Sequence, residues 1–312
     1  MTAFAFVFPG QGSQSVGMLD AWGGHPAVAS TLQEASAALG EDIGRLIHEG
    51  PKEQLDLTTN TQPVMLTAGI AAYRAWRAEG GATPAAVAGH SLGEYTALVA
   101  AGVLTLADAL PLVRLRAAAM QEAVPVGVGA MAAILGLDAQ AVRDGCKAAA
   151  EASGEVVEAV NFNDPRQVVI AGTKAGVEKA CEMLKAAGAK RALPLPVSAP
   201  FHSSLMKPAA VRLRAALEKV TLNAPAIPVV NNIDVASPAD AAAIRDALVR
   251  QAAGPVRWVE VVQSLKSRGI THVVECGPGK VLAGMAKRID GELVTGSLHD
   301  PATLAEVKGM LA

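Results

Sequence analysis

The sequence predicts an α/β protein with a large domain on a mostly parallel sheet and a smaller α+β unit inserted into it. Short, almost entirely apolar runs alternate with longer Ala-rich or amphipathic segments, and each run passes into a loop rich in Gly, Pro, Asn or Ser. Strands covered on both faces, as in a parallel sheet, have this continuous apolar character. The clearest runs are Phe4 to Phe8, Ala85 to Ala88, Ile227 to Val230 and His272 to Cys276.

The loops that follow these runs are predicted to share one edge of the sheet. In chain order they read PGQGSQ, GHSLGE, NNID and GPGK. In an open parallel sheet the carboxyl ends of the strands lie along the same edge, and ligand sites form in the crevice there. We therefore expect residues from distant parts of the chain to meet in a single cleft.

A different order of elements occupies the middle of the chain. Between about Val126 and Val197 the pattern predicts strand, helix, strand, strand, helix, strand, which is the order of a ferredoxin-like unit. The predicted strands are 130–135, 156–161, 168–171 and 192–197, and the predicted helices are 139–152 and 175–187. Glycines before this segment and prolines near its end suit two crossings between domains. The predicted boundaries are 1–125 and 198–312 for the large domain, which is discontinuous, and 126–197 for the insert.

Bulk composition narrows the class of protein and of partner. With 312 residues, 51% hydrophobic residues, 18% charged residues and a formal net charge of −2, the chain is typical of a soluble globular protein. The balanced charge does not favour nucleic-acid binding. Arg, Glu and Pro interrupt the apolar segments before they reach the roughly 18 residues that a membrane helix needs, so no membrane association is expected.

The N-terminal residues and the cysteines favour a cytoplasmic location. The segment MTAFAFVFPGQG contains an apolar run but lacks the positive region and the cleavage site of a secretion signal. Cys146, Cys181 and Cys276 are widely spaced and form neither CxxC pairs nor a disulfide pattern. We therefore expect reduced thiols and no metal site.

Ser91 lies between two glycines, after an apolar run and before a helix-forming segment, in VAGHSLGEYTALVAAG. The pentapeptide GHSLG fits the GxSxG nucleophile elbow, a sharp strand-to-helix turn that holds serine in a strained conformation with its hydroxyl exposed. Glycines on both sides avoid collisions within such a turn. A helix that begins there directs amide hydrogens toward an oxyanion beside the serine. The alternative is a serine that only caps the helix.

A nucleophilic serine needs a base, and His202 is the candidate. Of the six histidines, His90 adjoins Ser91 but points elsewhere in a tight turn, and two others lie in polar segments. His202 follows an apolar run and precedes two serines that mark the start of a helix, which places it at the end of a strand. A histidine with a purely structural role is the alternative.

Two glycine-rich loops follow predicted strands and contain residues suited to anion binding. In FPGQGSQ, Gly10 and Gly12 permit a tight loop whose Gln11 N–H could point inward as an oxyanion donor. As phosphate loops, this segment and GPGKVLAG both fail, because neither contains GxGxxG or GxxxxGK[ST].

The segment TLADALPLVRLRAAAMQEAV predicts a helix that begins with a capping box formed by Thr105 and Asp108. The remaining positions are almost wholly apolar. Arg114 and Arg116 are two residues apart and so face nearly opposite sides, and only one of them can easily reach water. The other arginine is either paired within the structure or held inside to bind an anion. The pattern alone does not say which arginine this is.

Several motifs follow one another along the chain: FPGQGSQ, GHSLGEY, RxxxMQ at 116–121, NFNDPRQVVIAG, PFHSSLM at 200–206, RQAAGPVRW and GPGKVL. In this order they resemble the malonyl-CoA:acyl carrier protein transacylase family over essentially the whole length. The resemblance implies a large α/β-hydrolase-like domain with a ferredoxin-like insert, which agrees with the division made above from the pattern of elements.

The resemblance implies roles for individual residues. Ser91 corresponds to the nucleophile that takes the malonyl group from coenzyme A as an ester, and His202 to its general base, which later protonates the leaving thiol. The backbone amides of Gln11 and Leu92 correspond to the oxyanion hole.

The resemblance also settles the choice between the two arginines. Arg116 corresponds to the residue that forms a bidentate pair with the malonyl carboxylate. Gln251 corresponds to the residue whose backbone carbonyl orients the histidine, in place of an acidic third member. Met120 would line the acyl pocket, and Phe201 matches the pattern that selects malonyl over methylmalonyl.

The implied activity is transfer of malonyl from malonyl-CoA to the phosphopantetheine thiol of an acyl carrier protein, for fatty-acid or polyketide synthesis. The resemblance implies a monomer without a permanently bound cofactor. A serine thioesterase or hydrolase would share the elbow but needs a route for water, and usually an acid between the serine and the histidine. The available acids, Asp138, Asp144 and Asp164, fall in the predicted insert or its loops. A non-catalytic carrier-binding module would need the serine and histidine only for structure.

Overall fold

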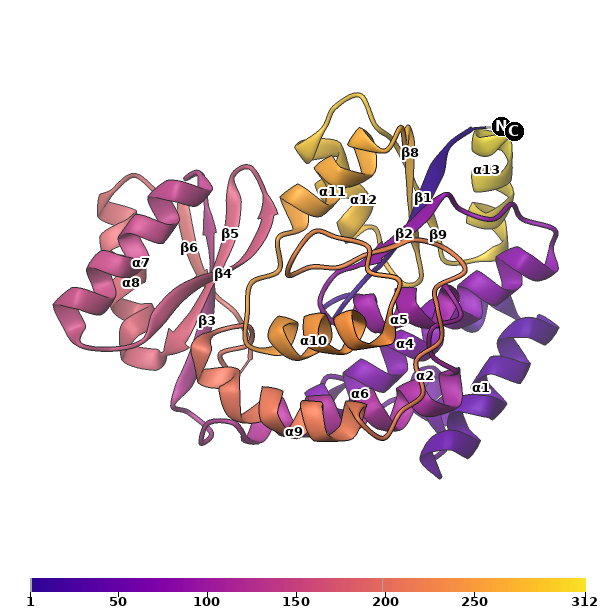
Figure 1. The fold of residues 1–312 in the computed structure, drawn as a ribbon, viewed down its shortest axis with the longest axis horizontal. Coiled ribbons are helices and arrows are strands. Elements are labelled where there is room, and N and C mark those ends of the chain that lie inside the picture. The colour runs from indigo at the N-terminus through magenta and orange to yellow at the C-terminus, as the bar shows by residue number, and fades with distance from the viewer. Residues whose placement is uncertain (1, 198) are drawn as a thin grey trace.

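The computed structural model describes residues 2–197 and 199–312 and shows two parts, each with its own sheet (Figure 1). The larger part contains a five-stranded sheet in the order β7-β2-β1-β8-β9, and the smaller part a four-stranded sheet in the order β4-β5-β3-β6. The strands described in the larger sheet pair in parallel, and those in the smaller sheet pair antiparallel. The predicted α/β class with a mostly parallel sheet is confirmed.

The centre of the larger sheet is β1 (Phe4–Phe8), between β2 (Ala86–Gly89) and β8 (His272–Cys276). Every residue of β1 is buried, because successive side chains point to opposite faces and helices cover both. Phe6 contacts Trp76 of α4 edge to face on one side, whereas Ala5 and Val7 pack against α11 and α12 on the other. This two-sided burial accounts for the continuous apolar run in the sequence.

The edge strands fit the sequence pattern less well. At one edge β7 contains only Val229–Val230, because Pro228 has no N–H to donate and the predicted run from Ile227 is cut short. At the other edge β9 (Val294–Leu298) was not among the clearest runs. Its sequence, VTGSL, contains glycine and polar residues, and its side chains are mostly only half-buried.

The helices of the larger part pack on both faces of this sheet (Figure 1). The helix α4, which is buried along most of its length, and α5 lie on one face, and α11 and α12 lie on the other. The bounds are α1 Pro26–Leu39, α2 Ile43–Glu49, α3 Lys52–Leu55, α4 Thr58–Ala78, α5 Gly93–Ala100, α6 Leu106–Glu122, α9 Lys207–Leu217, α10 Ala241–Ala252, α11 Trp258–Ser267, α12 Val281–Ile289 and α13 Pro301–Leu311, with short 3-10 helices at Asp20–Trp22 and Ser204–Met206. In the described ranges, no helix combines the length and apolar character needed to cross a membrane.

The helix α6 starts where the sequence predicts, but only half of the predicted capping box forms. The hydroxyl of Thr105 accepts the N–H of Asp108 at 3.0 Å. The same hydroxyl donates to the Asp108 carboxylate at 2.6 Å, which holds that carboxylate beside the side chain of the capping residue. The side chain of Thr105 thus caps the helix in the ordinary way.

The smaller part has the predicted order of strands and helices. Its elements are β3 Gly129–Leu135, α7 Ala139–Ser153, β4 Val157–Asp164, β5 Gln167–Thr173, α8 Lys174–Ala186 and β6 Arg191–Pro194. The helices α7 and α8 cover one face of this sheet. The other face carries Met131 and Val169, which pack with Phe201 from the chain that returns to the larger part. The boundaries of the insert stay a prediction, and Ser198, which begins the second predicted segment of the large domain, lies outside the described residues.

A buried carboxylate lies near the end of β8. Glu275 is fully buried, and its Oε2 accepts the N–H of Ala283 in the first turn of α12 at 3.0 Å. A carboxylate at a helix N-terminus is favoured by the positive end of the helix dipole. Burial nevertheless dominates and raises the pKa of Glu275 to about 7. Glu275 therefore holds the first turn of α12 against the end of β8.

Candidate active site

Ser91 occupies a sharp turn between β2 and α5, with a φ of 53° in the left-handed region. Both flanking glycines are required by close backbone approach. A Cβ atom on Gly89 would lie 1.9 Å from the carbonyl of Gly93, and one on Gly93 would lie 2.0 Å from the carbonyl oxygen of Phe8. The turn therefore has the geometry of a nucleophile elbow, in which the serine hydroxyl is presented at the strand end.

The hydroxyl of Ser91 lies 2.7 Å from Nε2 of His202. His202 also has a left-handed backbone, with a φ of 66°, in the loop that returns from β6 to α9. Its Nδ1 faces two backbone carbonyls, those of Gln251 at 3.0 Å and Gly254 at 3.2 Å. Because a carbonyl can only accept, Nδ1 carries the hydrogen and Nε2 is free to accept the serine proton.

The environment keeps His202 neutral. Burial, together with the nearby cation of Arg116, lowers the pKa of His202 to about 3, although the two carbonyls act in the opposite direction. A neutral imidazole can accept a proton, whereas an imidazolium cannot. The geometry and the protonation state are those of a general base for Ser91.

We expect the His202 ring to show no titration between pH 5 and pH 8. A histidine of ordinary pKa, about 6.5, would be only about 3% neutral at pH 5. The measurement is a ¹³C or ¹⁵N NMR titration of labelled imidazole rings. Arg116→Ala should raise the midpoint, because it removes one of the charges that disfavour the imidazolium. A midpoint near 6.5 in the unmodified chain would contradict this environment.

Arg116 of α6 is only 2% exposed and points into the site. Its Nη1 donates to Oε1 of Gln62 at 2.7 Å, and its Nη2 donates at 3.1 Å both to the hydroxyl of Ser91 and to Oε1 of Gln251. The guanidinium carbon also lies 5.4 Å from the ring centroid of Tyr95. Arg116 is thus the inward-facing arginine of the pair in the sequence.

Arg114 lies on the opposite side of α6. It forms an ion pair with Glu41 at 2.8 Å and donates to Asn60 at 3.2 Å. In the described part of the chain, no carboxylate comes within ion-pair distance of Arg116, whose partners are neutral oxygens and a ring. Burial lowers the pKa of Arg116, but a guanidinium stays protonated. A buried cation with only neutral partners is suited to receive an anionic group.

A cavity of about 580 Å³ lies above Ser91 and His202. Gln11 and Leu92, predicted to donate backbone amides to an oxyanion, both line it. Leu92 is the N-cap residue of α5, so its N–H lies at the amino-terminal end of that helix and has no partner within the helix. The Gln11 loop packs directly on the elbow, because a Cβ atom on Gly10 would lie 2.7 Å from the carbonyl oxygen of His90. The oxyanion role of the two amides stays a prediction.

The predicted acyl-pocket residues line the same cavity. Met120 is buried in α6, and the half-buried ring of Phe201 packs with it in one apolar cluster. The smaller part contributes Met131 and Val169, so the cavity lies where the two parts meet. His90 is turned away from Ser91, since its Nε2 lies 2.8 Å from Oδ1 of Asn163 in β4.

Sequence reasoning missed three residues that the structure places in the site: Gln62, Glu94 and Asn232. Gln62 holds Arg116, and the amide oxygen of Asn232 accepts the N–H of Ser91 at 2.7 Å. The loop NNID, which contains Asn232, was placed at the correct edge of the sheet, but nothing in its sequence distinguishes one asparagine as a partner of Ser91. Glu94 belongs to the GHSLGE segment, and nothing in that sequence distinguishes it as the partner of Asn232 and Gln251.

Comparisons with known proteins agree with this geometry. Residues 5–290 match the acyl transferase domain family. The chain is 56% identical to the malonyl CoA-acyl carrier protein transacylase of Escherichia coli (strain K12), over 98% of both chains, and 46% identical to that of Bacillus subtilis (strain 168), over 97% of this chain and 96% of the relative.

Solved structures show the same similarity. The crystal structure of the acyl-carrier-protein S-malonyltransferase from Burkholderia pseudomallei 1710b superposes with a TM-score of 0.97 at 69% identity, covering 98% of this chain and 99% of the other. A malonyl-transacylase in complex with a type II PKS acyl-carrier protein has a TM-score of 0.95 at 50% identity, covering 97% and 98%. On the family match, the identities and the fold, this chain belongs to the malonyl-CoA:acyl carrier protein transacylase family.

Proposed function

We propose that this chain moves a malonyl group from malonyl-CoA to the phosphopantetheine thiol of an acyl carrier protein through an ester on Ser91. The observation that supports this most directly is the buried guanidinium of Arg116, which lies 3.1 Å from the Ser91 hydroxyl and has neutral partners. A cation at that distance fits an acyl group that ends in a carboxylate, and malonyl is such a group.

The first half-reaction forms the ester. His202 accepts the proton of the Ser91 hydroxyl while the oxygen attacks the thioester carbonyl, and the carbonyl oxygen becomes negatively charged. The amides of Gln11 and Leu92 donate to this oxyanion. When the intermediate collapses, the carbon–sulfur bond breaks and His202 returns its proton to the sulfur of coenzyme A. In the second half-reaction the carrier thiol loses its proton to His202, attacks the ester, and Ser91 is reprotonated.

The buried cation also accounts for selection between acyl groups. A malonyl carboxylate can pair with Arg116, whereas an acetyl group leaves the cation without an anionic partner, which costs several kcal/mol. A thioester and a serine ester are similar in free energy, so transfer is reversible and water is the competitor. A cavity that excludes bulk water protects the ester until the thiol arrives.

The proposed partners follow from the same chemistry. The structurally similar malonyl-transacylase bound to a type II PKS acyl-carrier protein supports a transient complex with a carrier protein here. We propose malonyl-CoA as the donor and the carrier's phosphopantetheine as the acceptor, with no cofactor of the enzyme's own. The described residues contain no group of three or more His, Cys, Asp or Glu side chains able to hold a metal ion. The monomeric state and the cytoplasmic location stay predictions from the sequence.

Incubation with radiolabelled malonyl-CoA tests the proposal. The expected result is a base-labile label on Ser91 that passes to holo acyl carrier protein faster than it is released to water. Release to water without transfer would identify a serine thioesterase or hydrolase instead. A chain that takes up no label would be a non-catalytic carrier-binding module.

Phe201 offers a test of acyl selectivity. Phe201→Ala is expected to raise methylmalonyl transfer relative to malonyl transfer by about 10-fold, because the ring fills space that an α-methyl group would need, and one methyl group is worth about 1–3 kcal/mol. The measurement is kcat/KM for both thioesters, with malonyl in the same variant as the internal control. An unchanged ratio would show that another side chain limits the pocket.

A further inference from the structure

The backbone of Ser91 is held from both ends by side chains that lie far away in the sequence. Oδ1 of Asn232 accepts the Ser91 N–H at 2.7 Å, and Nε2 of Gln251 donates to the Ser91 carbonyl at 3.0 Å. Nδ2 of Asn232 also donates to the carbonyl of Gly89 at 2.7 Å, so both sides of the elbow are bound. Asn232 and Gln251 are fully buried.

One carboxylate oxygen binds both of these residues, Asn232 through its backbone and Gln251 through its side chain. Oε2 of Glu94 accepts the backbone N–H of Asn232 at 2.8 Å and Nε2 of Gln251 at 3.0 Å. Glu94 is 2% exposed and lies in the first turn of α5, three residues after Ser91. One oxygen therefore connects the two supports of the nucleophile.

Through Gln251 the same carboxylate is linked to the other two functional groups. The backbone carbonyl of Gln251 accepts Nδ1–H of His202, and its Oε1 accepts Nη2 of Arg116. Arg116 and Glu94 therefore bind opposite ends of one amide group. Burial raises the pKa of Glu94 to about 7, so this carboxyl group is only partly ionised at neutral pH, and its ionised form favours the protonated form of Arg116.

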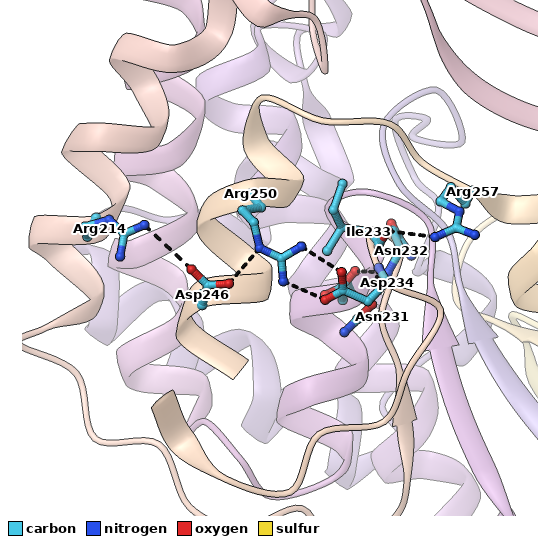
Figure 2. A network of polar contacts seen from close by, with 9 residues as sticks. Arg214, Asn231, Asn232, Ile233, Asp234, Asp246, Arg250 and Arg257 are labelled. Carbon is cyan, nitrogen blue, oxygen red and sulfur yellow. Dashed lines mark hydrogen bonds and ion pairs between the residues drawn. The ribbon is translucent and has the colours of Figure 1, made fainter. Parts of the chain in front are cut away.

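A second network of polar contacts includes residues next to Asn232 and Gln251 in the chain (Figure 2). Arg250, the neighbour of Gln251 in α10, donates to both carboxylate oxygens of Asp234 at 2.7 and 2.6 Å and to Asp246 at 2.6 Å. The N–H of Asp234 donates to Oδ1 of Asn231 at 2.8 Å. Arg250 therefore ties the end of α10 to the loop that carries Asn232, and these ion pairs are partly exposed to solvent.

We propose that Glu94 is a positioning residue, which holds Ser91, His202 and Arg116 in their relative geometry through Asn232 and Gln251. This inference rests on the proposed function of the site. Its physical basis is that Asn232 N–H and Gln251 Nε2 are buried donors, and a buried donor that loses its acceptor either costs free energy or moves to find another. If either support moves, the left-handed turn at Ser91 loses the hydrogen bonds that hold it.

The test compares Glu94→Gln and Glu94→Leu with a matched pair of variants at another buried carboxylate, Glu275→Gln and Glu275→Leu. Glutamine keeps an oxygen that can accept both donors but loses the charge, whereas leucine removes the acceptor. Two readouts are used for folded protein: labelling of Ser91 by a fluorophosphonate, which does not need Arg116, and ester formation from malonyl-CoA and acetyl-CoA.

For Glu94→Gln we expect labelling to be slower by about 3-fold with a melting temperature close to that of the unmodified chain, and for Glu94→Leu slower by about 30-fold. The preference for malonyl over acetyl should also fall in Glu94→Leu, because Gln251 no longer holds Arg116. Per folded molecule, both Glu275 variants should keep the labelling rate of the unmodified chain and its preference for malonyl over acetyl.

If Glu94→Leu does not fold, a double-mutant cycle of Glu94→Gln with Asn232→Ala replaces it, and non-additive labelling rates are expected, because Glu94 acts on Ser91 partly through Asn232. Additive rates, or unchanged rates and preference in the Glu94 variants, would overturn the inference. A loss as large in the Glu275 variants would also overturn it, since the effect would then be general instability. Failure of the unmodified chain to form a malonyl ester would instead contradict the proposed function.

Discussion

Ser91→Ala is expected to abolish the malonyl ester and to lower malonyl transfer by about 10⁴-fold or more. The hydroxyl is the only part of Ser91 that can form the covalent bond, and the remaining groups of the site offer only binding and oxyanion stabilisation. The variant should fold, because the side chain of Ser91 donates its hydrogen bond to His202 at the wall of a cavity and fills no core position. The measurement is transfer of label to holo acyl carrier protein, together with intact-mass detection of the ester.

Ser30→Ala is a suitable control for the serine substitution. Its hydroxyl donates to the carbonyl of Ala27 on the exposed side of α1, and Ser30 does not line the cavity. This variant should keep both the ester and the transfer rate. A malonyl ester that persists in Ser91→Ala would place the nucleophile on another side chain.

Arg116→Ala is expected to reduce malonyl transfer by about 10²–10³-fold and acetyl transfer by less than about 10-fold. The substitution removes the cation that pairs with the malonyl carboxylate. Loss of one partner of a buried ion pair costs about 3–5 kcal/mol, because the other charge is left unpaired. Acetyl has no carboxylate, so its transfer loses only the contact of Nη2 with the Ser91 hydroxyl. The measurement is kcat/KM for malonyl-CoA and acetyl-CoA with the same acceptor.

Arg114→Ala is the matched control, because it removes an arginine two positions away in the same helix. Its guanidinium binds Glu41 and Asn60 outside the cavity, so both activities should stay near those of the unmodified chain. Arg116→Lys should not restore malonyl transfer fully, since an ammonium cannot reproduce the bidentate contact. Equal losses for malonyl and acetyl in Arg116→Ala would contradict a role in carboxylate recognition.

The parts of the fold that the sequence predicts best are those with two-sided burial. The bounds of β1 and β8 agree with their predicted runs, because strands covered on both faces are almost continuously apolar, and Glu275 is the one buried acidic residue within β8. The edge strand β9 is exposed along one side and tolerates glycine and serine, so its pattern does not distinguish it from a loop. Pro228 has no backbone N–H to donate to the sheet, so β7 is shorter than the predicted run. The apolar character of the run does not by itself show this.

For the site, local motifs were informative and long-range contacts were not. The elbow at Ser91 is encoded by its own glycines, and helical spacing shows that Arg114 and Arg116 diverge. Spacing does not show which of the two faces the core, since that depends on the helices packed around α6. Asn232 is 141 residues from Ser91 in the chain, and only the folded sheet brings its amide to the elbow.

Among the described residues other than glycine, positive φ angles occur at Ser91, His202 and Val235. A left-handed residue with a side chain costs of order 1 kcal/mol or more relative to glycine. Selection for heat resistance alone would therefore favour glycine at both the proposed nucleophile and the proposed base. At these two positions the chain has given up stability, so variants evolved only to withstand higher temperature are expected to become well-folded, inert proteins.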